Sequence, residues 1–260
     1  VLYSISDDIG ILWKTDSPTL TKLSDDIALN SSLEGWLKNN PGYFDVWNSV
    51  KHVPPASRAD ISFLQAFKNI VDDLSLQNHI DGEFKVETKS YGYKIRVSGY
   101  HKNLDEIDLP TPLHGNAGVP NPNNPNDITI VSIGTPTNPA TKGRIQISNR
   151  LNEQGSHLPY TARVDAEIPP NSGYFFPKTG TDGINPGSGR SSIFPDDWTD
   201  SQILEEIAYV RRNMTVSDLD ATTGIYSRLN SSGTFKIGMY INGDLMDMSS
   251  AIGSAFPVLQ

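Results

Sequence analysis

The sequence contains no cysteine, and this absence removes several kinds of chemistry at once. Without thiols the chain has no disulfides, no thiolate nucleophile and no cysteine-ligated zinc. Its five histidines are scattered, without the close His–His spacing that zinc sites on one element use. We therefore expect no metal centre and no cofactor, and a modulating role of Mn²⁺ stays open.

Long apolar runs and an excess of basic residues are also missing. No apolar stretch of the sequence approaches the roughly 18 residues that a membrane-spanning helix needs, so we expect no membrane span. The net charge is −9, which disfavours a broad electrostatic contact with nucleic acid. A protein of this composition that contacts nucleic acid has to gather its cations in one cleft. The chain starts at Val1, not Met, and lacks a signal-peptide pattern, so we expect a piece of a longer protein.

The first part of the chain has helical periodicity. Ser31–Glu34 match a capping-box pattern, which is typical of a helix start. From Asp60 onward, apolar residues such as Leu64 and Phe67 recur at helical intervals. We predict a small helical N-terminal segment over residues 1–78.

From about residue 80 the apolar period changes to two, which is typical of half-buried strands. The alternation predicts strands within the ranges 84–88, 95–97, 128–133, 144–148, 160–168, 234–241 and 251–259. Between them, the Pro- and Asn-rich stretch 120–126 and the Gly-, Pro- and Ser-rich stretch 171–190 are predicted to be exposed loops. Asn242-Gly243 predicts a tight hairpin turn.

One helix interrupts the predicted strands. Thr199 is the expected N-cap, with Gln202 completing a capping box, and Ile203 and Ile207 belong to the expected buried stripe. The order of helices, strands, one helix and strands indicates an α+β fold with antiparallel sheets against which this helix packs.

The most informative motif is Gly189–Thr199, where a polar loop runs into Ile193-Phe194-Pro195 and then Trp198. It resembles the Ser-Ser/Thr-Phe-Phe-Pro-x-x-Trp-Ser/Thr signature of bacterial EndoU-type endoribonucleases, of the barnase–EndoU–colicin–RelE class. Gly253–Pro257 resembles a second, C-terminal fragment of the same pattern. The resemblance implies an EndoU-like catalytic domain over residues 79–260.

Cleavage of RNA without a metal needs a base for the ribose 2′-OH, an acid for the leaving 5′-oxygen and a group that stabilises the transition-state charge. Two histidines suit the acid–base roles because the pKa of histidine lies near neutrality. His101, in the Gly-x-His context that follows Gly99, matches the family's first histidine. His114 matches the second by spacing alone, and His79 is the alternative to it.

The family's lysine, shortly before the Ser-Ser/Thr-Phe segment, is missing here. Arg190 stands in that region and is the candidate for the phosphate contact, with Lys178 as the alternative if the loop folds back. Ser192 is expected to hydrogen-bond the base or the phosphate. The resemblance implies that Ser254 and Phe256 recognise and stack on a base, and core packing is the equal alternative for Phe256.

The expected function follows from this resemblance. It implies a metal-independent endoribonuclease that cleaves single-stranded RNA or tRNA and leaves 2′,3′-cyclic phosphate ends. It also implies the C-terminal toxin module of a larger secreted bacterial protein, delivered into the cytoplasm of a competing cell and blocked by a cognate immunity protein. The alternatives are a catalytically inactive EndoU-like binding module and an unrelated secreted hydrolase in which Asp196 and Asp197, or other carboxylates, act as an acid–base pair.

Overall fold

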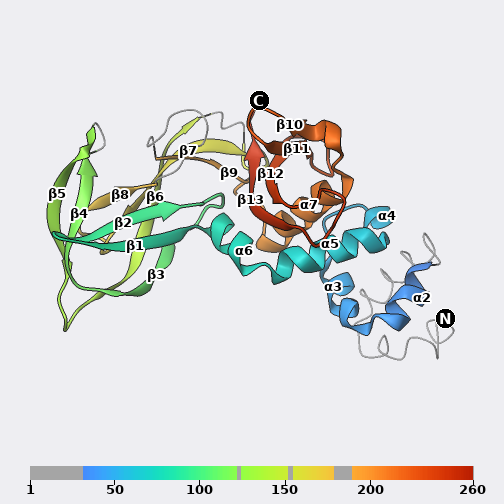
Figure 1. The fold of residues 1–260 in the computed structure, drawn as a ribbon, viewed down its shortest axis with the longest axis horizontal. Coiled ribbons are helices and arrows are strands. Elements are labelled where there is room, and N and C mark those ends of the chain that lie inside the picture. Colours follow the sequence, from blue (N-terminus) through green and yellow to red (C-terminus); the bar gives the residue numbers. More distant parts are fainter. Residues whose placement is uncertain (1–31, 122–123, 152–154, 179–188, 260) are drawn as a thin grey trace. The chain divides into compact units, whose positions relative to one another are not determined.

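A computed structural model describes residues 32–121, 124–151, 155–178 and 189–259 (Figure 1). The chain divides into two compact units, each formed by two separate segments. Unit 1 comprises Val1–Leu74 and Thr199–Gly253, and unit 2 comprises Ser75–Trp198 and Ser254–Gln260. The first crossing between units lies near the expected boundary at residue 78. The chain returns to unit 1 at Thr199, so the units are not continuous segments. The predicted division into a helical segment and a continuous catalytic domain stays a prediction.

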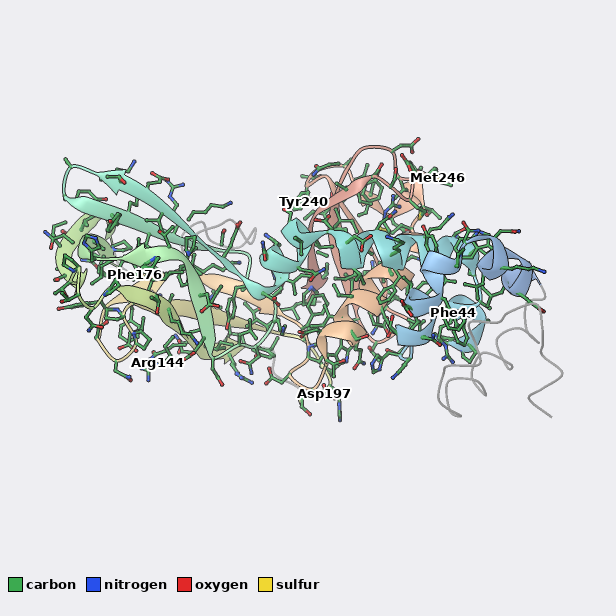
Figure 2. All side chains as sticks on the ribbon, turned by 90° about the horizontal axis from the view of Figure 1, so that it is seen from below. Phe44, Arg144, Phe176, Asp197, Tyr240 and Met246 are labelled. Atoms are coloured by element: carbon green, nitrogen blue, oxygen red, sulfur yellow. The ribbon has the colours of Figure 1, made fainter. Side chains whose placement is uncertain are left out.

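Unit 1 consists of helices and a small sheet. Among its described residues, the helices are α2 (Ser32–Asn39), α3 (Phe44–Ser49), α4 (Pro55–Arg58), α5 (Ile61–Asp72) and α7 (Asp200–Asn213), with the short 3₁₀ helices η3 (Pro41–Tyr43) and η4 (Val216–Asp218). Its sheet has the order β10 (Leu219–Asp220), β11 (Ile225–Leu229), β12 (Lys236–Asn242) and β13 (Ala251–Val258). Tyr240 and Met246 project from this unit into solvent (Figure 2).

The two main helices of unit 1 begin where the sequence predicts. The Asp60 side chain accepts hydrogen bonds from the backbone N–H groups of Ser62 and Phe63 at the start of α5. The Thr199 hydroxyl accepts one from Gln202 at the start of α7. These caps satisfy N–H groups that the first helical turn leaves without partners. The expected N-cap of α7 is confirmed.

Unit 2 begins with α6 (Leu74–Asp81), and its other described elements are strands. One sheet has the order β1 (Glu83–Lys89), β2 (Gly92–Ser98), β4 (Gly115–Asn121) and β5 (Asn124–Gly134). The other has the order β3 (Glu106–Leu113), β6 (Ala140–Leu151), β7 (Tyr160–Glu167) and β8 (Phe175–Pro177), and β9 (Arg190–Ile193) also pairs with β7. All these pairings are antiparallel except that of β2 with β4.

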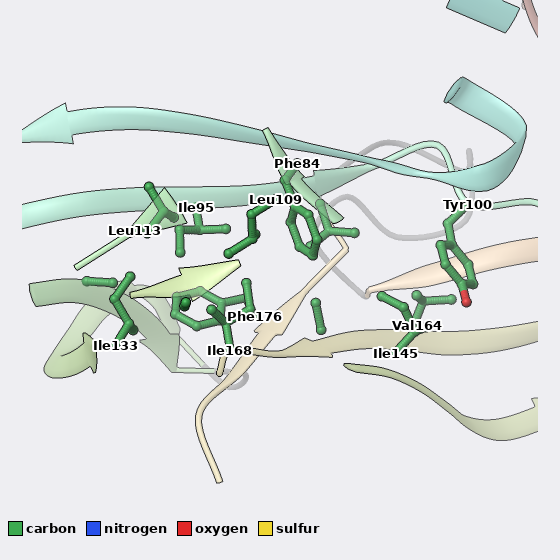
Figure 3. Close-up of a cluster of buried hydrophobic side chains, with 14 of the residues drawn as sticks. Phe84, Ile95, Tyr100, Leu109, Leu113, Ile133, Ile145, Val164, Ile168 and Phe176 are labelled. Atoms are coloured by element: carbon green, nitrogen blue, oxygen red, sulfur yellow. The ribbon is translucent and has the colours of Figure 1, made fainter. Parts of the chain in front are cut away.

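The core of unit 2 is formed by side chains from both of its sheets (Figure 3). Phe84 and Ile95 come from β1 and β2, whereas Val164 and Phe176 come from β7 and β8. Phe176 and Val164 are completely buried. Because such interiors are packed as densely as organic crystals, this core fixes the strand ends from which the polar residues emerge.

The predicted α+β class, with antiparallel sheets, a packed helix and an N-terminal helical segment, is confirmed. The predicted loops were partly wrong. Strands β4 and β5 extend into the stretch 120–126, and β8 lies within the stretch 171–190. The aromatic run Tyr174-Phe175-Phe176 accounts for β8, because burial of Phe176 favours a strand over an exposed loop. The prediction of a tight hairpin turn at Asn242-Gly243 was also wrong, because β12 ends at Asn242 and β13 starts only at Ala251.

Within the described residues, no helix combines the length and the apolarity needed to cross a membrane.

Candidate active site

Two histidines come together where β2 ends against α6, within unit 2. The backbone N–H of Tyr100 donates to the carbonyl of His79 (2.8 Å), and that of His101 donates to Ile80 (2.7 Å). The imidazole rings of His79 and His101 lie with their centroids 5.2 Å apart. Gly99 makes this approach possible, because it has a positive φ of 68° and a Cβ there would lie 2.1 Å from the His79 carbonyl oxygen.

Lys178 reaches the same place from the end of β8. Its backbone N–H donates to the carbonyl of Val164 on β7 (2.9 Å), and the residue forms a parallel bridge with Val97 at the end of β2. Its side chain is buried, and Nζ donates to the carbonyl of Arg190 (3.2 Å) and to the hydroxyl of Ser191 (3.1 Å). Strand β8, which lies in a stretch predicted to be a loop, therefore carries a cation into the protein interior.

Strand β9 lines the site with alternate residues. Ser191 is completely buried, and its hydroxyl lies 3.3 Å from Nδ1 of His101. Side chains alternate between the two faces of a strand, so those of Arg190 and Ser192 point to the face opposite Ser191. The backbone carbonyl of Ser192, however, lies 2.7 Å from Nδ1 of His101.

This carbonyl sets the tautomer of His101. A carbonyl oxygen only accepts hydrogen bonds, so Nδ1 of His101 must carry the proton that it donates to Ser192. In the neutral imidazole, Nε2 then holds the lone pair. His101 is therefore held in the tautomer in which Nε2 acts as a proton acceptor.

The second half of β13 supplies two further residues. Ser254 and Phe256 are two positions apart on this strand, and therefore share a face. The Ser254 hydroxyl lies 2.8 Å from Nε2 of His79, and the Phe256 ring centroid lies 5.7 Å from that of His101. Phe256 is only partly buried, which leaves part of its ring accessible.

The electrostatics of the cluster keep both imidazoles neutral near pH 7. Burial, followed by the nearby charge of Lys178 and by His79, holds the pKa of His101 well below its ordinary value, against the effect of the Ser192 carbonyl. Burial and the charge of Lys178 also lower the pKa of His79, while Glu83 opposes the shift. Titratable groups that disfavour each other's charged forms in this way are typical of functional sites.

The structure brings together most of the predicted site residues. His101, Lys178, Ser254 and Phe256 form one cluster with His79, the alternative to His114. The assignment of these residues to catalysis and substrate binding stays a prediction, because geometry alone does not test it.

Three of the predicted site residues do not place their side chains in this cluster. His114 is exposed and follows Leu113, which lies at the opposite end of the buried cluster from Tyr100, the neighbour of His101 (Figure 3). Arg190 contributes its carbonyl to Lys178, and Ser192 contributes its carbonyl to His101. In both, the backbone faces the site and the side chain follows the other face of β9.

The carboxylates Asp196 and Asp197 have separate partners. Asp196 accepts hydrogen bonds from Arg150 (2.7 Å), Tyr160 (2.7 Å) and Asn103 (3.0 Å), and Asp197 is bonded to His157. This arrangement secures the turn after β9 and gives no support to the alternative in which the two carboxylates act as an acid–base pair.

Two residues of this cluster were not among the first predictions: His79 was only the alternative to His114, and Ser191 was not predicted. The signal for His79 was its place just before Gly82, where the helical period ends and the strands begin. The signal for Ser191 was the period-two alternation of the Arg190–Ile193 stretch, which places Ser191 on the same face as the buried Ile193.

The described side chains include no group of three or more His, Asp or Glu residues that could hold a metal ion. The polar groups of the site are imidazole, ammonium and hydroxyl, the types that bind and protonate a phosphodiester.

Comparison with known proteins connects this site to a family. A family model described as Bacterial EndoU nuclease matches residues 134–259, a range that includes Lys178, Ser191 and Phe256. His79 and His101 precede the matched range. No curated protein and no solved structure matches the chain.

Proposed function

Because residues 134–259 form a bacterial EndoU nuclease domain, which is an endoribonuclease that acts on RNA, we propose that the chain cleaves RNA without a metal. The proposed catalytic groups are His79 and His101, which precede the matched range, and Lys178 within it. In this reaction the ribose 2′-OH attacks the adjacent phosphorus and the bond to the 5′-oxygen breaks. The products are a 2′,3′-cyclic phosphate and a free 5′-OH. The observation that carries the proposal is the 5.2 Å separation of the two imidazoles beside a buried lysine.

His101 is the proposed base. Its Nδ1–H is bound to the Ser192 carbonyl, so Nε2 has the lone pair that takes the proton from the 2′-OH. Its lowered pKa keeps it unprotonated at neutral pH, as a base requires.

His79 is the proposed acid. It is less buried than His101, and a bound phosphodiester adds a negative charge that favours its protonated form. The protonated ring then donates to the leaving 5′-oxygen. The Ser254 hydroxyl, 2.8 Å from Nε2, orients the ring before the substrate binds.

Lys178 is the proposed electrostatic group. Its ammonium, buried beside both imidazoles, stabilises the charge that develops on the phosphorus oxygens in the transition state. In this assignment Lys178 replaces the lysine that the family keeps nearer to the Ser-Ser/Thr-Phe segment, and Arg190 has no direct part.

Phe256 is the proposed platform for the base next to the cleaved bond. Its partly exposed ring beside His101 allows a base to stack there, a contact that contributes about 1–3 kcal/mol. A phenyl ring selects for no particular base, so the preference among the four bases is expected to be weak.

The test is digestion of tRNA and of a mixed-sequence RNA in the presence of EDTA, followed by analysis of the fragment ends. The account predicts fragments with 2′,3′-cyclic phosphate ends, lost in the His101→Ala variant and retained in His157→Ala, which removes an exposed imidazole bonded to Asp197. An intact RNA substrate after digestion by the wild-type chain would favour the inactive binding module. Cleavage by His101→Ala at the wild-type rate would contradict the assignment of the base.

We further propose that the domain is the toxin module of a larger secreted bacterial protein that acts in the cytoplasm of a competing cell and is bound by an immunity protein. The family resemblance is the support for this context. Expression inside a bacterial host tests it: growth should stop with the wild-type chain and continue with His101→Ala. Continued growth with an active wild-type enzyme would contradict it. Rescue by co-expression of a neighbouring gene would identify the immunity partner.

A further inference from the structure

Ser191 is a completely buried hydroxyl surrounded by the polar groups of the site. It donates to the carbonyl of Tyr100, accepts from Nζ of Lys178 (3.1 Å) and lies 3.3 Å from Nδ1 of His101. The backbone of Tyr100 has a φ of 73°, which is rare for a bulky residue. The hydroxyl therefore contacts the lysine, one histidine and the strained residue just before that histidine.

The capacity of the hydroxyl matches these contacts. A serine has one proton to donate and two lone pairs that accept. Because the Tyr100 carbonyl can only accept, the proton of Ser191 points there, and its lone pairs face Nζ of Lys178 and Nδ1 of His101. The Nδ1 proton of His101 goes mainly to the Ser192 carbonyl at 2.7 Å, so its 3.3 Å contact with Ser191 is the weaker, shared one. A buried hydroxyl without partners is unfavourable, so an alanine would serve better if only packing mattered.

We propose that Ser191 is a positioning residue of the active site, whose hydroxyl holds the Lys178 ammonium beside His101. This inference rests on the proposed roles of Lys178 and His101. Ser191 does not contact RNA in this account. It acts through the lysine, whose charge has to stay at the phosphate during the reaction, and through the backbone that directs His101.

The first experiment compares Ser191→Thr with Ser191→Val. The two side chains have nearly the same shape, so the effect of the added carbon is shared and only the hydroxyl differs. We expect kcat of Ser191→Val to be about 10- to 100-fold below that of Ser191→Thr, a part of the 10²–10⁴-fold that a positioned acid–base group contributes. KM should change little, because the lysine acts mainly in the transition state.

The matched control is Thr161→Val. Thr161 is buried, pairs with Ser192 in register, and therefore faces the side of β9 opposite Ser191. The Thr161→Val variant also loses a hydroxyl from the β7–β9 strand pair, yet its kcat should stay near the wild-type value. Equal kcat values for Ser191→Thr and Ser191→Val would overturn the proposal.

The second experiment follows Lys178 without relying on catalysis. The folded variants are treated briefly with an amine-acylating reagent, and the modification of each lysine is measured by mass spectrometry, with the exposed Lys142 as internal reference. Lys178 should react faster in Ser191→Val than in Ser191→Thr. Equal rates would overturn the proposal even if activity falls, because the effect would then not pass through the lysine.

The two experiments separate this inference from the proposed function. If the wild-type chain does not cleave RNA but Ser191→Val exposes Lys178, the proposed function fails and the role of Ser191 in holding the lysine stands. If the chain cleaves RNA and neither measurement distinguishes Thr from Val, only the inference fails. Ser191→Ala, which adds no volume, replaces Ser191→Val in both experiments if that variant does not fold.

Discussion

Buried charged groups have different surroundings in the two units. In unit 1, Glu205 accepts from the backbone N–H groups of Lys51 (2.9 Å) and His52 (2.6 Å), and Arg211 donates to the carbonyls of Leu245 (2.6 Å) and Asp247 (2.7 Å). Each charge meets main-chain groups of complementary polarity.

In unit 2 the buried cation Lys178 lies beside His79 and His101, and it disfavours their protonated forms. Positive charges on these three groups repel one another, and a bound anion would reduce that repulsion. Lys178 also donates to a main-chain carbonyl, that of Arg190, so main-chain contact alone does not distinguish the units. The difference is that the charge of Lys178 lowers the pKa values of two neighbouring imidazoles, an arrangement that favours binding of an anion.

The largest expected effect is the loss of catalysis on substitution of the unit 2 histidines. His79→Ala and His101→Ala should each lower kcat by about 10²–10⁴-fold, the range of a positioned acid or base. The thermal midpoint should fall little in His79→Ala, whose side chain is only partly buried. It should fall further in His101→Ala, which empties a buried position and removes a hydrogen bond to the Ser192 carbonyl. Single-turnover cleavage and thermal unfolding measure both. Substantial cleavage by either variant would break the distinction.

The next largest effect tests the proposed electrostatic role of Lys178. Lys178→Met should lower kcat by about 10²–10³-fold, as loss of an electrostatic transition-state group does. It should also raise the pKa values of both histidines, because a positive neighbour is gone. The base then becomes unprotonated only at higher pH, so the acid limb of kcat/KM should move to higher pH. A limb that stays in place would contradict the coupling.

In unit 1 the corresponding change should affect stability instead. Glu205→Ala leaves the backbone N–H groups of Lys51 and His52 without their acceptor. Because these hydrogen bonds are partly buried, we expect each to contribute about 0.5–1.5 kcal/mol, the usual net value of an intramolecular hydrogen bond. Urea unfolding should show this loss, while kcat of the folded protein stays near the wild-type value. Unchanged stability would show that the main-chain bonds of Glu205 are dispensable.

The wild-type pH profile sharpens the comparison further. The folded-state pKa values of His79 and His101 lie below the ordinary 6.5 of histidine, so the protein keeps an unprotonated base below that pH. The acid limb of kcat/KM should therefore have its midpoint below 6.5. An acid limb centred above that value would contradict the burial and the lysine effect.

The smallest expected effect distinguishes the two cations. Arg190→Ala should lower kcat by less than about threefold, which corresponds to under 1 kcal/mol of transition-state stabilisation. The reason is that alternation directs its side chain away from Ser191 and Lys178. A loss as large as that of Lys178→Met would return the phosphate contact to Arg190.

Local signals in the sequence predicted much of this molecule. The N-cap Thr199, the helical period that starts at Asp60, the period-two strands and the α+β class follow from chemistry within a few residues. The family resemblance through the Phe194-Pro195 motif is supported by the matching family model.

The composition of the site was harder to predict because it depends on distant contacts. His79 joins it because Gly99 lets β2 end against α6, and Lys178 joins it because Phe176 draws a supposed loop into the core as β8. Spacing along the chain instead favoured His114. It could not show that the long β3 separates that residue from His101.

The most direct test of the cluster compares two histidines that the sequence could not rank. Single-turnover cleavage of a labelled RNA in EDTA should fall at least about 100-fold in His79→Ala and stay near the wild-type rate in His114→Ala. The reverse result, with His114→Ala inactive and His79→Ala active, would contradict the assignment of the site to His79, His101 and Lys178.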